Sequence, residues 1–361
     1  MSNPVAPPEL SVIVPTLNEE GTLPGLLENL GQQRGISFEL IIVDGGSRDD
    51  TRVLAVSAVT DFHLVQVDSP AGRGTQFNAG VRRARGEWLL FLHADSRFAD
   101  PTALARGVGH LIAESERLSA PLIAGRFALR FADTGGHHPG AYAFYESKAR
   151  QNRPGCIHGD QGFLLQRHLF SRLGPFATDL PFLEDERFAE RVFQQGKWLL
   201  LPAEITTSAR RFVAEGLFRR QWLNALILNA LAVGWFDFLQ AAPGLYRSQD
   251  QAGRIDLRAL ARAVRGLLRD RPWRERWRLC YDSAAFALDN AWQLLLALDV
   301  RLGLRRNCYF RGEKTPCLDR WEKPLRRVCR WLPGRFLLAV GLGTGGYLLL
   351  IFGSRSPRRE L

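Results

Sequence analysis

The chain has 361 residues but only five cysteines, and nothing in their spacing suggests a disulfide framework. Cys156 stands alone, and the other four show no C-x-x-C spacing. A sparse, odd set of cysteines excludes a small disulfide-stapled fold and favours free structural thiols over a metal site. The first ten residues, MSNPVAPPEL, lack a basic segment followed by an apolar one. We therefore predict no secretory signal and expect the reducing cytoplasm.

Internal repeats and low-complexity tracts are also missing. Hydrophobic residues make up 46% of the chain and charged residues 24%, which is ordinary for a globular protein. This composition excludes a collagen-like or wholly disordered chain. The length predicts one large domain with an appendage, or two domains.

Positive charge is unevenly distributed along the chain. The formal net charge is +11, but residues 1–245 hold 24 Lys+Arg against 26 Asp+Glu, a net of −2. Residues 246–361 hold 24 Lys+Arg against 11 Asp+Glu, a net of +13. We therefore predict a neutral domain over 1–245 and a basic, mainly helical tail over 246–361. Such a tail suits phosphate-rich partners, either nucleic acid or anionic lipid.

The first hundred residues alternate between short apolar runs and helical patterns. Strands are expected at Leu10–Pro15, Phe38–Val43, Phe62–Val67 and Glu87–Leu92, separated by helices of about ten residues. This order predicts an α/β fold built from βαβ units. Ligands of such sheets bind at the carboxyl ends of the strands, where this chain carries its polar residues.

The pattern loosens after residue 100, but further elements are predicted. A long amphipathic helix is expected over Phe212–Leu239, and the remaining elements are helices at 101–118 and 184–195 and strands at 122–131, 163–166, 198–201 and 204–208. A glycine-flanked turn, Gly159-Asp160-Gln161-Gly162, precedes one of these strands. From Arg254 onward, arginine recurs at helical spacing.

Two segments near the amino terminus suit a nucleotide. Asp44 ends a strand and precedes two glycines, so its carboxylate can accept a hydrogen bond from a ring N–H of a base. Glu19 can accept from ribose hydroxyls. Arg73 lies between two glycines at a helix start, where a diphosphate can approach. Turns with helix caps at Ser47 and Asp49 are the alternative.

Two further segments carry acids suited to chemistry. His93 and Asp95 lie two residues apart at a strand end, so both point the same way and can hold a divalent cation. The histidine makes Mn²⁺ more favourable than carboxylates alone would. Asp185, within PFLEDER at a helix start, can act as a general base. Helix capping is the competing explanation for these acids.

Taken together, VPTLNE, VDGGSRDDT, GRGTQFNAG, FLHADS and FLEDERF make the chain resemble the inverting family 2 glycosyltransferases over about residues 10–240. The resemblance implies a GT-A fold, which is a mixed Rossmann-like sheet flanked by helices. It also implies a hexosyltransferase, an enzyme that transfers a hexose. His-Ala-Asp in place of Asp-x-Asp, with TSARRF at 207–212, is similar to a bacterial subfamily named for radical-SAM/selenodomain neighbourhoods and arsenosugar biosynthesis.

The resemblance also implies where the donor binds. It assigns the nucleoside pocket to Pro15, Thr16, Asn18 and Glu19. It assigns the base contact to Asp44, with Gly46 and Ser47 beside it. Arg73 and Asn78 are placed along the nucleotide. A UDP-sugar is favoured because an aspartate at position 44 suits uracil, although guanine and thymine also present ring N–H groups.

The same resemblance implies the chemistry. Asp95 binds the cation, Mn²⁺ or Mg²⁺, whereas His93 departs from the family pattern and leaves the first acid's contact open. Asp185 is the general base that takes the proton of the acceptor hydroxyl. Arg210 and Arg211 neutralise diphosphate charge in the transition state.

The tail suggests a membrane surface rather than nucleic acid. Its arginines interleave with tryptophans, and no nucleic-acid-binding module is recognised. Residues 336–353 form an uncharged apolar run of 18, short for a membrane span. A membrane-embedded helix, a monotopic or re-entrant anchor and a buried helix of a soluble tail all remain open. We expect a lipid-linked or small-molecule acceptor and the cytoplasmic face of the plasma membrane, with the cytoplasm as the alternative.

Two other functions compete with the leading one. A non-catalytic GT-A module could bind a nucleotide or glycan at a membrane assembly, and the histidine at position 93 is the feature that favours it. A soluble transferase that makes a small glycoside is the other. Metal-dependent hydrolysis of a nucleotide sugar would exclude the non-catalytic module. Lack of membrane association would identify the soluble transferase.

Overall fold

The computed structural model describes residues 7–118, 122–180, 182–245, 253–305, 314–329 and 332–341. The chain forms two compact units. Unit 1 comprises the chain up to residue 133 together with 145–209, and unit 2 comprises 134–144 and the chain from 210 onward. Unit 2 thus begins before the change in composition at residue 246. The predicted functional division at 245 stays a prediction.

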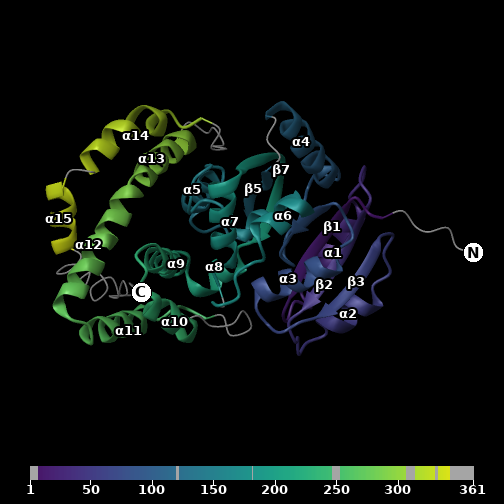
Figure 1. The fold of residues 1–361 in the computed structure, drawn as a ribbon, viewed down its shortest axis with the longest axis horizontal. Coiled ribbons are helices and arrows are strands. Elements are labelled where there is room, and N and C mark those ends of the chain that lie inside the picture. Colours follow the sequence, from purple (N-terminus) through teal and green to yellow (C-terminus); the bar gives the residue numbers. More distant parts are fainter. Residues whose placement is uncertain are drawn as a thin grey trace, which may run out of the picture. The chain divides into compact units, whose positions relative to one another are not determined.

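Unit 1 is built on one seven-stranded sheet in the order β3-β2-β1-β4-β6-β5-β7 (Figure 1). The strands are β1 Leu10–Thr16, β2 Phe38–Asp44, β3 His63–Asp68, β4 Trp88–Phe91, β5 Ile123–Ala132, β6 Phe163–Gln166 and β7 Lys197–Ser208. Strands β1 to β4 run parallel, β6 is antiparallel to both neighbours, and β5 is parallel to β7. The sheet confirms the predicted α/β fold with a mixed sheet.

Helices cover both faces of this sheet. They are α1 Leu23–Gly31, α2 Thr51–Ser57, α3 Arg73–Arg83, α4 Ala103–Leu118, α6 Arg167–Leu173 and α7 Glu184–Gln195, with a short 3₁₀ turn η1 at Gly159–Gln161. Successive residues of β1 point to opposite faces. Val12 and Val14 pack in one core with Leu26 of α1, whereas Ile13 packs in a second core with Phe77 of α3 and Phe188 of α7. Burial on both faces explains why the strands read as continuous apolar runs.

Two predictions about elements were wrong. Residues 198–201 and 204–208 belong to one strand, β7, which tolerates Pro202 because it lies at the edge of the sheet. The long helix predicted over 212–239 is three helices, α8 Arg210–Glu215, α9 Leu217–Ala232 and α10 Phe236–Ala241. Gly216 and Gly234 break it, since both adopt positive φ, at 85° and 70°.

Unit 2 is helical. After the turn η2 (Ala242–Leu245) it contains α11 Leu257–Arg269, α12 Trp273–Asp289, α13 Trp292–Arg305, α14 Pro316–Cys329 and α15 Leu332–Gly341, while α5 (Pro139–Ala149) is shared between the two units. Helix α12 packs against α15, and α13 packs against α14. Buried Asp299 of α13 accepts the N–H groups of Cys317 and Leu318 at 2.8 and 2.9 Å, which caps the start of α14.

The apolar segment 336–353 is only partly visible. Its first residues form the end of α15, and the remainder lies outside the described residues. None of the helices in the described part of the chain combines the length and hydropathy that a membrane crossing requires.

Candidate functional site

The ends of β1 and β2 form a tight polar turn around Asp44. Its carboxylate is only 1% exposed and accepts the N–H groups of Gly46 and Ser47, both at 2.9 Å. The hydroxyls of Ser47 and Thr16 also donate to it, at 2.5 and 3.3 Å. The structure therefore brings together four of the residues that were predicted to bind the nucleotide sugar. The observed contacts show Asp44 holding this turn, and its contact with a base stays a prediction.

The loops that follow β1 and β2 are joined by hydrogen bonds. The N–H of Asn18 donates to Ser47 Oγ at 2.9 Å, and Asn18 Oδ1 accepts the N–H of Arg48 at 2.9 Å. The N–H of Glu19 donates to Thr51 Oγ1 at 2.7 Å. Pro15 precedes this rim, opposite Val43 in the sheet register. All seven predicted residues of this region thus lie at one edge of the sheet.

Helix α3 carries a residue to which the sequence had assigned no role. Buried Gln76 donates from Nε2 to the carbonyls of Thr16 and Val43, at 2.9 and 2.7 Å, and so closes the ends of β1 and β2. Asn78 uses both atoms of its amide on the backbone of Phe176, at 2.9 Å each. Its observed role is to anchor the segment before α7, and its nucleotide contact stays a prediction.

Arg73 begins α3 and faces the acidic start of α7. Its Nε lies 2.6 Å from Glu184 Oε1, and its side chain is 39% exposed while that of Glu184 is buried. Gly74 permits this approach. A Cβ there would lie 2.4 Å from the carbonyl oxygen of Ala177 and 3.2 Å from Glu184 Cβ.

Gly74→Ala should therefore destabilise the protein and displace Arg73. We expect a loss of about 1–3 kcal/mol in the free energy of unfolding, because a backbone carbonyl must move to admit the methyl group. Urea unfolding measures it. Gly109→Ala in α4 is the matched control, since nothing lies within 4 Å of its Cβ. The control should be neutral or stabilising by about 0.5–1 kcal/mol, and equal stability of the two variants would contradict the packing argument.

His93 and Asp95 follow β4. Asp95 Oδ2 accepts from Thr207 Oγ1 and from the N–H of Ser208, at 3.1 and 3.3 Å, so the end of β7 orients this carboxylate. Burial and the charge of Arg73 lower the pKa of His93 to about 4, against the opposing effects of Asp95 and Asp185. The imidazole is therefore neutral near pH 7, the form that binds metals.

Asp185 lies in the first turn of α7, between two other acids. The helix begins after Leu183, whose φ of 69° is left-handed, and its positive end favours acids there. Asp185 Oδ2 accepts the N–H of Gly159 at 2.8 Å, and Oδ1 accepts that of Glu186 at 2.9 Å. Burial raises the pKa of Asp185, but Arg73, His158 and these two N–H groups outweigh burial and lower it. The carboxylate is thus held ionised.

The turn η1 completes the site, although we predicted no role for it from the sequence. A Cβ on Gly159 would lie 3.2 Å from His93 Nε2 and 3.3 Å from Asp185 Oδ2, so both residues face this glycine. Burial raises the pKa of Asp160 to about 6; Asp185 and Asp95 also raise it, against His158 and Arg73. Its Oδ1 is buried and has no hydrogen-bond partner among the described residues. The sequence feature that could have pointed to this turn is the glycine-flanked motif Gly159-Asp160-Gln161-Gly162.

The residues present fit a divalent cation that is held largely by a substrate. Within the described ranges, no three His, Cys, Asp or Glu side chains are arranged as a complete metal site. Asp95 nevertheless offers Oδ1, which has no described hydrogen bond, while its Oδ2 is fixed by β7. Mg²⁺ and Mn²⁺ sites in phosphate-handling enzymes use one or two carboxylates and complete their shell with phosphate oxygens and water. Asp95 and the neutral His93 match that pattern.

Arg210 and Arg211 lie in α8, which belongs to unit 2. Arg211 Nε is 2.9 Å from Glu215 Oε1, and Arg220 pairs with the same carboxylate at 2.9 Å. Arg211 is therefore held by an ion pair within unit 2, and the contact of Arg210 and Arg211 with a diphosphate stays a prediction.

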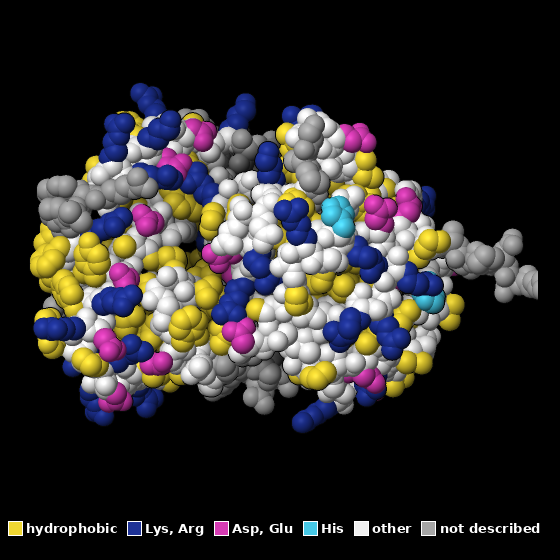
Figure 2. Space-filling view, in the orientation of Figure 1, with side chains coloured by type: hydrophobic (Ala, Val, Ile, Leu, Met, Phe, Trp, Pro, Cys, Tyr) yellow, Lys and Arg dark blue, Asp and Glu magenta, His cyan; other side chains and the backbone are white. Residues whose placement is uncertain are grey.

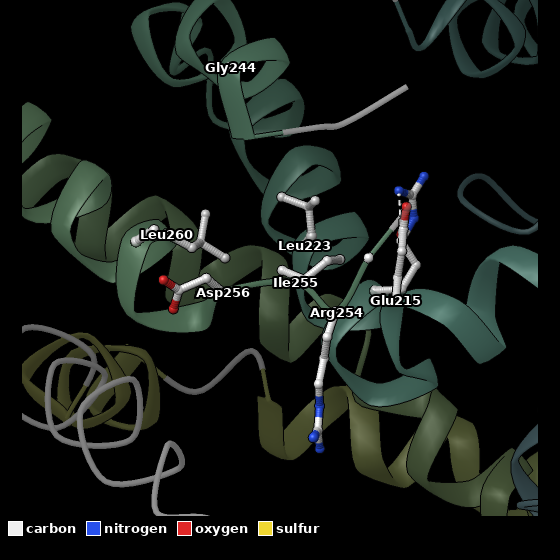
Figure 3. Close-up of a pocket in the computed structure, with 10 residues that line it drawn as sticks. Glu215, Leu223, Gly244, Arg254, Ile255, Asp256 and Leu260 are labelled. Atoms are coloured by element: carbon white, nitrogen blue, oxygen red, sulfur yellow. Dashed lines mark hydrogen bonds and ion pairs between the residues drawn. The ribbon is translucent and has the colours of Figure 1, made fainter. Parts of the chain in front are cut away.

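Unit 2 also contains a cavity of about 110 Å³. Figure 3 shows Leu223, Ile255 and Leu260 around it, with Glu215 at one side. None of the predicted site residues lines this cavity. The candidate catalytic groups lie instead in unit 1, where Arg73, Asp95 and Asp185 act on the same two residues, His93 and Asp160.

Comparison with known proteins finds a matching family model and similar proteins. Residues 11–174 match the family model described as "Glycosyl transferase family 2". A PGL/p-HBAD biosynthesis glycosyltransferase of Mycobacterium bovis (strain BCG / Pasteur 1173P2) is 33% identical over 192 residues, which cover 52% of this chain and 71% of that protein.

Two solved structures are more distant. The mannosyltransferase PcManGT from Pyrobaculum calidifontis, in complex with GDP-Man and Mn²⁺, is 21% identical with a TM-score of 0.45, covering 93% of this chain and 87% of that one. TarS 1–349 of S. aureus is 17% identical with a TM-score of 0.46, covering 84% of this chain and 90% of that one.

Proposed function

Since the chain belongs to glycosyl transferase family 2 and is a glycosyltransferase with a GT-A fold, we propose that it transfers a sugar from a nucleotide diphosphate to an acceptor hydroxyl with inversion. The observation that carries this proposal is the meeting of Arg73, Asp95 and Asp185 in unit 1. Their charges act on the same half-buried groups, His93 and Asp160, although they come from three separate segments.

Asp185 is the general base of this proposal. The oxygen of the acceptor hydroxyl forms a bond to the anomeric carbon from the face opposite the leaving group. The bond from that carbon to the diphosphate oxygen breaks, and the hydroxyl proton moves to the Asp185 carboxylate. The lowered pKa of Asp185 keeps the carboxylate ready to accept it. General-base help of this kind contributes about 10²–10⁴-fold to the rate.

Asp95 and His93 would hold the divalent cation beside the diphosphate. A divalent cation held by these two residues would supply positive charge against the negative charge that develops on the leaving diphosphate. Arg73 adds positive charge to the same region, since its effect reaches His93, Asp160 and Asp185. Arg210 and Arg211 are proposed to act on the diphosphate as well.

The turn around Asp44 is the proposed base site, and a UDP-sugar is the favoured donor. A thermal-shift panel of UDP, GDP and TDP with Mn²⁺ or Mg²⁺ tests it. A ligand present at one hundred times its Kd stabilises the folded state by about 2.7 kcal/mol. We expect the largest shift for UDP with a cation. Equal, negligible shifts for all nucleotides would contradict a donor site here.

The finer assignments also belong to this proposal. His93-Ala94-Asp95 and the TSARRF segment are the features that favour the subfamily named for radical-SAM/selenodomain neighbourhoods and arsenosugar biosynthesis. A lipid-linked acceptor at the cytoplasmic face of the plasma membrane is favoured by unit 2, whose surface suits anionic lipid.

That surface combines basic and aromatic side chains. Trp222, Trp273 and Trp321 are all more than half exposed, and hydrophobic and basic side chains intermingle over the helices of unit 2 (Figure 2). Arg274 and Arg320 each lie 5.6 Å from the ring centre of the neighbouring tryptophan. Tryptophan and arginine side by side are typical of proteins that bind at a membrane interface.

Exchange of Arg274 and Arg320 for glutamine should therefore weaken binding to phosphatidylglycerol vesicles by about tenfold or more, because each basic residue near an anionic surface contributes about 1 kcal/mol. Co-sedimentation of the full chain measures this. Arg172→Gln, at an exposed position of α6 in unit 1, is the control. Equal binding to pure phosphatidylcholine, or no loss in the double variant, would contradict the membrane proposal.

A further inference from the structure

Three consecutive acids begin α7, and the structure treats them differently. Glu184 forms an ion pair with Arg73 at 2.6 Å, and Glu186 forms one with His158 Nδ1 at 2.5 Å. Asp185, between them, has no ion pair within 4 Å among the described residues and is held only by backbone N–H groups. The flanking glutamates thus occupy the nearby cations and leave the middle carboxylate free to take a proton.

The His158–Glu186 pair also holds both donors of Asp185. Gly159, which follows His158, donates its N–H to Asp185 Oδ2, and Glu186 donates its own N–H to Asp185 Oδ1. One contact between side chains therefore fastens the turn η1 to the first turn of α7. The Glu186 side chain is 11% exposed and that of His158 is 35% exposed, so the carboxylate is shielded from water while about a third of the imidazole is exposed.

We propose that His158 and Glu186 are positioning residues, an ion-pair clip that fixes the two N–H donors on the Asp185 carboxylate and supplies the positive charge that keeps it ionised. This inference rests on the proposed role of Asp185 as base. It assigns a role to two side chains that neither touch the acceptor in the mechanism above nor belong to the cation site.

The charge of His158 supports the clip. Burial alone would lower the pKa of His158, but Glu186 in contact with it outweighs burial, and Asp160 and Asp185 add to its effect, so the pKa rises to about 9. The imidazole is therefore charged at neutral pH. The other charged groups that act with Asp185 are Arg73 from α3, Asp160 from η1 and Glu184 beside it in α7, and His93 faces the same glycine in neutral form.

The sign of the expected effect follows from these charges. Removing the positive charge of His158 raises the pKa of Asp185, so the base becomes protonated at a higher pH. Opposite charges at such separations shift a carboxyl pKa by about 1–3 units when buried. We expect the acid limb of the kcat profile to move up by about 1 pH unit in His158→Gln. Glu186→Gln should move it the same way, because the loss of the contacting carboxylate lowers the pKa of His158 and weakens its positive charge.

Kinetics of donor hydrolysis with UDP-glucose or GDP-mannose and Mn²⁺, between pH 3 and 9, supply the first readout. A positioning role predicts lower kcat with donor KM nearly unchanged, and a double variant no worse than either single one. His63→Gln, at the exposed amino end of β3, is the control and should follow the wild type. Any limb of the pH profile that Asp160 itself contributes should be missing in Asp160→Asn. Unshifted limbs in both clip variants would overturn the electrostatic role.

A second readout does not depend on activity. In NMR of the full chain with labelled histidine, the His158 resonance is identified by its absence in His158→Gln. In the wild type this resonance should titrate near pH 9. In Glu186→Gln the midpoint of its titration should fall below pH 7. Titration at the ordinary histidine value in the wild type would overturn the clip. If Asp185→Asn keeps its turnover, the base assignment fails while the NMR result still decides whether the clip exists.

Discussion

Asp185→Asn should lower kcat by about 10²–10⁴-fold and leave donor affinity within a factor of a few. The amide cannot take the acceptor proton, but it keeps the size of the side chain, and its single oxygen can still accept one of the two N–H groups, that of Gly159 or that of Glu186. Steady-state kinetics with a donor panel, together with isothermal binding of the nucleotide diphosphate, separate the two quantities.

Asp179→Asn is the matched control for this experiment. Asp179 precedes the same helix, but its side chain is 63% exposed and pairs with Arg187 at 2.5 Å, outside the site. Its loss should leave kcat within about twofold, as for most surface substitutions. A variant at position 185 that turns over as fast as this control would remove Asp185 from the role of base.

Asp95→Ala should abolish the metal dependence of donor binding and weaken binding in the presence of Mn²⁺ by about 100-fold or more, because a metal clamp on phosphate contributes several kcal/mol. The described residues do not by themselves form a three-ligand site, so the cation and the diphosphate should bind together. Titration of nucleotide diphosphate with and without Mn²⁺ measures this coupling.

Asp61→Ala provides the comparison, since Asp61 is an exposed carboxylate before β3 with no part in the site. It should retain full metal-dependent binding. Equal donor affinity of the wild type and Asp95→Ala in Mn²⁺ would show that the cation, if bound, is held elsewhere.

The sheet was readable from the sequence because its central strands β1, β2 and β4 are buried on both faces, whereas β3 is half-buried and still carries alternating apolar residues. Apolar β-branched runs separated by helical patterns located β1, β2, β3 and β4 within one or two residues, and polar residues at their carboxyl ends marked the site. Helix breaks were less visible. Gly216 and Gly234 sit within an apolar pattern that continues across them, and only their left-handed backbone shows that three helices are present.

Contacts between distant residues could not be predicted in the same way. Gln76 lies inside a noticed motif, yet its role depends on two carbonyls that the fold brings to it. His158 and Glu186 are 28 residues apart, and each alone looks like an ordinary polar residue. Their pairing exists because η1 precedes β6, whose antiparallel direction brings that turn to the edge where β4 ends.

The central claim, that the acids of unit 1 form a metal-dependent transferase site, is tested most directly by following donor hydrolysis with proton NMR. The purified chain with Mn²⁺ should release the sugar of UDP-glucose or GDP-mannose, and the first anomer to appear should have the configuration opposite to the donor. Chelation of the metal, Asp95→Ala and Asp185→Asn should each suppress the release. Release that survives all three changes, or that first yields the anomer with the donor's own configuration, would contradict the account.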